Sequence, residues 1–103
     1  MWKRIDNLKI SEFDNILKIA KEVEIPNKFK ATLKGGIDIF FNGRKVAMIY
    51  YIFSSTRDFN KGDIILNTDV FDRRRDITPS ERIKLGEQIW EDLIKKHEEI
   101  KNI

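Results

Sequence analysis

The stretch IDIFFNGRKVAMIYYIF, residues 37–53, contains the strongest structural signal in the chain. Two apolar runs flank Asn42 and Gly43, a dipeptide that suits the positive backbone angles of a type I′ turn. Because such a turn joins two strands directly, it predicts an antiparallel hairpin. A regular ladder from this turn sets three pairs on one face of the sheet: Phe41 with Arg44, Ile39 with Val46, and Ile37 with Met48.

The preceding segment KFKATLK, residues 28–34, alternates polar and apolar residues and predicts another strand of the same sheet. If Leu33 lies opposite Ile37, a loop with glycine at its left-handed position connects the two strands. This register places lysines and aromatic rings together on the second face of the sheet. The residues expected on that face are Lys28, Lys30, Thr32, Asp38, Phe40, Lys45, Ala47, Ile49, Tyr51 and Phe53.

Two helices and one more strand are expected around this hairpin. Ser11 and Asp14 form an approximate capping box, which predicts a helix that starts at Ser11. Apolar residues at helical spacing follow, and Pro26 is expected to end that helix. The segment DIILNTDV, residues 63–70, predicts a further strand. Thr78 and Glu81 form a capping box, which predicts the start of a long helix. The fold class is therefore expected to be α+β, with an N-terminal helix, a mainly antiparallel sheet of about four strands and a long C-terminal helix.

Length and composition bound the class of protein. A chain of 103 residues is the length of one small globular domain, residues 1–103. The chain has no cysteine, so it offers neither a disulfide framework nor a thiolate site. No run of about 18 consecutive apolar residues occurs, which predicts a protein without a membrane span or a membrane partner. We therefore expect a cytoplasmic protein.

Basic residues concentrate in the first half of the chain. The formal net charge is +3, and residues 1–50 contain ten Lys and Arg against six Asp and Glu, whereas the remainder contains ten against eleven. A positive balance of this size permits an anionic partner without requiring one.

Few residues have the pattern of a catalytic site. His97 is the only histidine, and its place in an apolar helical stripe favours a packing role. The chain contains no glycine-rich phosphate-binding motif. Glu12, Asp38 and Lys45 are residue types of a metal-dependent nuclease, but the acid-x-Lys element expected on a core strand is missing. We expect no cofactor, no metal and no enzymatic activity.

An arginine cluster precedes the C-terminal helix in DVFDRRRDITPSE, residues 69–81. One interpretation is a self-compensated loop, in which neighbouring aspartates neutralise Arg73, Arg74 and Arg75. The other is a phosphate or carboxylate site, because guanidinium groups bind such anions with paired hydrogen bonds. Arg57 and Lys61 of the neighbouring loop would then contribute to the site.

The face of lysines and aromatic rings has the composition of a nucleic-acid surface, in which cations follow the backbone and rings stack on bases. Phe40, Tyr51 and Phe53 would supply the rings. Lys28 and Lys30 have a simpler interpretation, since lysines on an edge strand prevent aggregation.

The leading hypothesis is a small non-enzymatic protein that binds nucleic acid with little base specificity. The alternative is a protein-interaction module or inhibitor, of the accessory kind that viruses or mobile elements encode, which binds a protein partner or forms a homodimer. In the alternative, the aromatic rings and arginines would form the centre of the interface.

Overall fold

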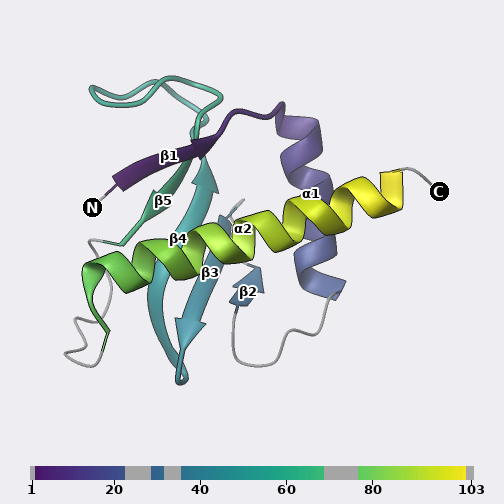
Figure 1. Ribbon diagram of the computed structural model, residues 1–103. Helices are drawn as coiled ribbons and strands as arrows, with labels where there is room; N and C mark the ends of the chain where they lie inside the picture. The colour runs from purple at the N-terminus through teal and green to yellow at the C-terminus, as the bar shows by residue number, and fades with distance from the viewer. Residues whose placement is uncertain (1, 23–28, 32–35, 69–76, 102–103) are drawn as a thin grey trace.

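A strand and a helix precede a run of four strands, and a long helix follows them (Figure 1). The computed structural model describes residues 2–22, 29–31, 36–68 and 77–101. The elements are β1 (Trp2–Asp6), α1 (Ile10–Glu22), β2 (Phe29–Ala31), β3 (Gly36–Phe41), β4 (Arg44–Tyr51), β5 (Ile64–Asn67) and α2 (Pro79–Lys101). This architecture confirms the α+β class. In the described part of the chain, no helix is long and apolar enough to cross a membrane.

The five strands form one antiparallel sheet in the order β1-β5-β4-β3-β2. Strands β2 to β5 are neighbours in sequence order and form a meander. Strand β1 pairs with β5 at the far edge, so α1 carries the chain from one edge of the sheet to the other. The sequence predicted about four strands. Strand β1 was not predicted, because its segment has no clear periodicity.

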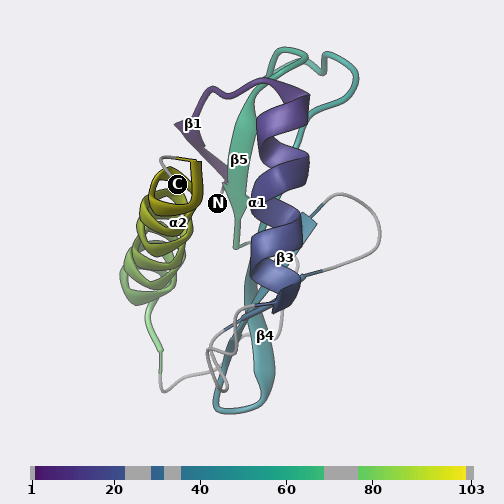
Figure 2. The same ribbon diagram turned by 90° about the vertical axis from the view of Figure 1, so that its right-hand side faces the viewer.

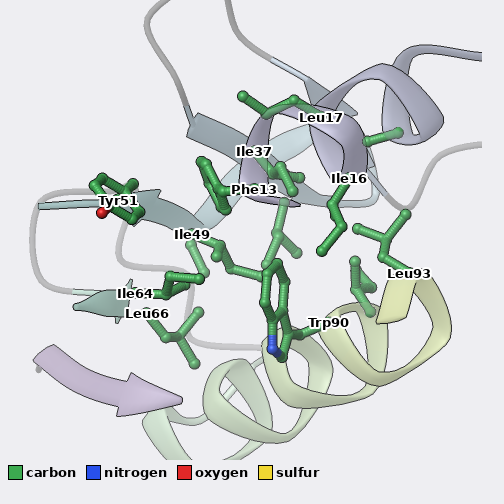
Figure 3. Close-up of a cluster of buried hydrophobic side chains, with 14 of the residues drawn as sticks. Phe13, Ile16, Leu17, Ile37, Ile49, Tyr51, Ile64, Leu66, Trp90 and Leu93 are labelled. Atoms are coloured by element: carbon green, nitrogen blue, oxygen red, sulfur yellow. The ribbon is translucent and has the colours of Figure 1, made fainter. Parts of the chain in front are cut away.

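Both helices pack against the same face of the sheet and against each other. In Figure 1 α2 crosses in front of the strands, and in Figure 2 α1 lies in front of them. The ring of Phe13 lies at the centre of the core, with its centroid 5.8 Å from that of Tyr51 and 6.1 Å from that of Trp90 (Figure 3). Side chains around it come from both helices and three strands: Ile16, Leu17, Ile37, Ile49, Ile64, Leu66 and Leu93.

The start of α2 confirms Thr78 as the N-cap of the helix. The backbone N–H of Glu81 donates to Oγ1 of Thr78 at 3.2 Å, and that hydroxyl donates to Oε1 of Glu81 at 3.1 Å. The start of α1 differs from the prediction: the helix begins at Ile10, and the carbonyl of Lys9 accepts the first helical hydrogen bonds. Ser11 therefore lies within the first turn instead of capping it.

The hairpin turn is confirmed, with φ angles of 50° at Asn42 and 79° at Gly43, and Phe41 lies opposite Arg44. Beyond the next pair the predicted register is wrong. A β-bulge at Val46 leaves that residue without a direct partner, because a bulged strand places two residues against one. The pairs that follow are Ile39 with Ala47, Asp38 with Met48, Ile37 with Ile49, and Gly36 with Tyr50.

Beyond the bulge, each residue of β4 lies on the opposite face of the sheet from the one that the sequence predicted. Ile49 and Tyr51 lie on the covered face, whereas Met48 and Tyr50 lie on the face without helices. Both Val46 and Ala47 are fully buried, so packing in the core accounts for the extra residue.

The register of β2 also differs from the prediction, since Ala31, not Leu33, lies opposite Ile37. The shift is two residues, so it leaves the alternation of faces unchanged. Lys30 therefore shares a face with Asp38, as the sequence predicted, although the observed register sets the two residues directly opposite each other.

Candidate functional site

The exposed part of the sheet lies on the β3–β4 hairpin. We define the hairpin face as Asp38, Phe40, Lys45, Met48 and Tyr50, which point to the side of the sheet opposite α1 and α2. All five are partly exposed. The same face is fully buried where it continues onto β5.

A carboxylate lies between two lysine positions on this face. Nζ of Lys45 lies 3.5 Å from Oδ1 of Asp38, and the two side chains are 40% and 14% exposed. On the other side of Asp38, β2 places Lys30 directly opposite. Arg4 of β1 shares this face farther across the sheet, opposite Ile65. Among the described residues placed on this face, three basic positions therefore accompany one acid.

Two aromatic side chains lie on either side of Asp38 along the hairpin. Phe40 lies toward the turn, opposite Lys45, and Tyr50 lies toward the other end, opposite Gly36. Gly36 adds no side chain beside the Tyr50 ring. The hairpin face therefore combines two rings, a cation and an acid within two adjacent strands.

Two of the aromatic residues expected on this face lie elsewhere. Tyr51 is 9% exposed and packs against Phe13 in the core, which corrects its expected position. Phe53 follows the end of β4 and is 53% exposed, with its ring centroid 5.2 Å from that of Tyr51. Sequence reasoning missed Tyr50, because β4 is apolar on both sides and no local signal marks the bulge.

Arg57 and Lys61 lie in the loop between β4 and β5, at the end of the sheet opposite the hairpin turn (Figure 1). The Arg57 side chain is 94% exposed, and its Nε lies 3.6 Å from Oδ1 of Asp58. Since β4 spans about 25 Å, these two cations do not join Phe40 and Lys45 in one site.

The remaining predicted residues fall at or beyond the limits of the described chain. Lys28 and the arginine cluster Arg73, Arg74 and Arg75 lie outside the described residues. Lys30 is placed by its backbone register alone. The proposed anion-binding role of the arginine cluster stays a sequence-based prediction.

A second surface feature is a groove of about 450 Å³ between β1 and α2. Its apolar lining comes from Ile5, Trp90 and Ile94, and charged side chains of both signs surround them. Lys3 of β1 forms an ion pair with Glu87 of α2, which connects the two walls. The balance of charges favours neither an anionic nor a cationic ligand.

The described residues contain no group of three or more His, Asp or Glu side chains that could hold a metal ion. His97 is 8% exposed, on the buried side of α2. Its Nε2 and the Nε1 of Trp90 are buried without a hydrogen-bond partner in the described part of the chain. Both residues lie on the buried side of α2, seven positions apart.

Comparison with family models, with curated proteins and with solved structures found no match to this chain.

Proposed function

We propose that the protein binds single-stranded nucleic acid through the hairpin face. The observation that supports the proposal most directly is the juxtaposition of Phe40, Tyr50 and Lys45 on the side of the sheet that neither helix covers. Aromatic rings on an open antiparallel sheet provide stacking platforms for unpaired bases. Lys45, with Lys30 and Arg4 across the sheet, would contact the phosphate backbone.

The geometry favours single strands over duplexes. Bases within a duplex present only their edges, whereas Phe40 and Tyr50 offer ring surfaces that suit exposed base planes. The two rings lie on adjacent strands and are separated by the row of Asp38 and Met48. This spacing suits two bases of one extended strand.

The proposal can be tested by fluorescence anisotropy with labelled single-stranded and duplex DNA and RNA. We expect the single strands to bind more tightly than the duplexes. With about three phosphate contacts, the affinity for a single strand should fall about twentyfold between roughly 50 and 200 mM salt, because binding releases condensed counterions.

Two variants test the contribution of stacking. Phe40→Leu and Tyr50→Leu should each weaken binding about tenfold, because each removes a stacking platform and keeps apolar bulk. Phe53→Leu is the matched control, since Phe53 is exposed and lies off the hairpin face. Equal losses in all three variants, or no binding at low salt, would contradict the proposal.

The groove beside β1 favours a second candidate function, the binding of an extended segment of a protein partner. Strand β1 is at the edge of the sheet, and in the described part of the chain no strand pairs with its outer side. An edge strand beside a helix can accept an added strand, whose side chains would pack on Trp90 and Ile94. Apolar packing of this kind should survive high salt, which distinguishes it from nucleic-acid binding.

A further inference from the structure

We propose that Asp38 selects the base that binds on the hairpin face and confers a preference for guanine. This inference rests on the proposed nucleic-acid binding and goes beyond it, because the residue types alone predict little base specificity. Asp38 is the residue on this face that can accept hydrogen bonds from a base without donating any.

The position of Asp38 argues for a role in recognition. It lies in the row between Phe40 and Tyr50, where the edge of a base stacked on either ring would project. Its side chain is 14% exposed, and Oδ1 is buried without a hydrogen bond in the described part of the chain. A negative charge in this place repels phosphate, so it weakens nucleic-acid binding unless a base compensates for it.

Guanine is the base whose edge fits a carboxylate best. Its N1–H and its 2-amino group are adjacent donors, and a carboxylate can accept both hydrogen bonds at once. Uracil offers a single N–H between two carbonyl oxygens, which repel the carboxylate. Cytosine and adenine offer an amino group beside an acceptor nitrogen and should fall between the two.

The ion pair with Lys45 fits this role. The Lys45 side chain is 40% exposed and its Nζ lies 3.5 Å from Oδ1, so water and other anions can compete for it. A nucleotide carries both a phosphate for Lys45 and a donor edge for Asp38. Binding therefore exchanges one ion pair for two contacts, and it releases the carboxylate oxygens to the base.

The test uses three labelled eight-nucleotide RNAs: one of uridines, one with guanosine at alternate positions and one with inosine at those positions. Fluorescence anisotropy should show the guanosine RNA binding about tenfold more tightly than the uridine RNA. Inosine lacks the 2-amino group, so the inosine RNA should bind with intermediate affinity. Asp38→Asn should bring the guanosine-to-uridine ratio close to one and strengthen binding of the uridine RNA.

Two control variants show whether a change in the guanosine-to-uridine affinity ratio is specific to Asp38. Lys45→Gln should weaken binding of all three RNAs and preserve the ratio. Asp58→Asn removes the same charge from the exposed β4–β5 loop and should also leave the ratio unchanged. The thermal unfolding midpoint of each variant, measured alongside, confirms that it is folded.

Three outcomes would overturn the inference. Equal affinities of the wild-type protein for the three RNAs, or a guanosine preference that survives in Asp38→Asn, would contradict the role of Asp38 and leave nucleic-acid binding itself supported. Absence of binding to any RNA at low salt would overturn both the inference and the proposed function.

Discussion

Nζ of Lys45 lies 3.5 Å from Oδ1 of Asp38, across the β3–β4 hairpin and in the middle of its exposed face. The Lys45 side chain is 40% exposed, so water screens the attraction from the lysine side, whereas the Asp38 side chain is only 14% exposed. Such a pair contributes little to the stability of a sheet. Its position between two aromatic side chains agrees with a role in binding.

We therefore predict that Asp38→Asn and Lys45→Gln each lower the free energy of unfolding by less than about 1 kcal/mol. Urea unfolding followed by circular dichroism would measure this change. A loss above about 2 kcal/mol in either variant would identify the pair as a structural element, since exposed pairs do not reach that value.

Because of the β-bulge at Val46, truncation of two neighbouring residues should have different effects on the free energy of unfolding. Ile49 is fully buried in the core, whereas Met48 lies partly exposed on the hairpin face. Ile49→Ala should lower the free energy of unfolding by about 2–5 kcal/mol, and Met48→Ala should lower it by about 1 kcal/mol or less. A regular hairpin without the bulge predicts the reverse order, so urea unfolding of the two variants tests the register.

Helix α2 packs closely against β5 at Gly86. A Cβ atom added there would lie 2.5 Å from Cδ1 of Leu66, a side chain that is itself fully buried. Gly86→Ala should therefore lower the free energy of unfolding by about 1–3 kcal/mol, although alanine favours a helix.

The double variant Gly86→Ala with Leu66→Val identifies the cause of that loss. Valine shortens the contacting side chain, so the double variant should be more stable than the sum of the two single changes predicts. If the two losses in free energy of unfolding simply add, the loss caused by Gly86→Ala does not come from contact with Leu66.

Thr78 caps α2 through the hydrogen bond from the backbone N–H of Glu81. Thr78→Ala should lower the free energy of unfolding by about 1 kcal/mol, and Thr78→Ser should preserve it. Ser80→Ala is the matched control, because Ser80 is exposed in the first turn of α2 and is not the residue that accepts the Glu81 hydrogen bond. Thermal unfolding of the three variants measures the difference, and equal midpoints would show that the cap does not stabilise the helix.

The elements that the sequence predicted well depend on local interactions. The Asn42 and Gly43 turn requires positive φ angles, and the capping box at Thr78 connects residues three apart. Both signals can be found without knowledge of the rest of the chain, because the residues that make the contacts are close in sequence.

The features that the sequence did not predict depend on distant residues. The bulge at Val46 is stabilised by packing of that residue and Ala47 in a core that includes both helices. Pairing of β1 with β5 joins Trp2 to Asn67, residues far apart in the chain. The register between β3 and β4 decides which residues lie on the hairpin face. Because the sequence did not predict the bulge, it indicated Tyr51 at the place that Tyr50 occupies in the structure.

Chemical-shift mapping by nuclear magnetic resonance tests the central claim most directly. A single-stranded RNA of eight nucleotides would be titrated into ¹⁵N-labelled protein at low salt, and backbone amide shifts would be followed. The account predicts that the largest changes occur on β3 and β4, at Asp38, Phe40, Lys45 and Tyr50. Changes confined to the β1–α2 groove or to the β4–β5 loop, or no change at all, would contradict it.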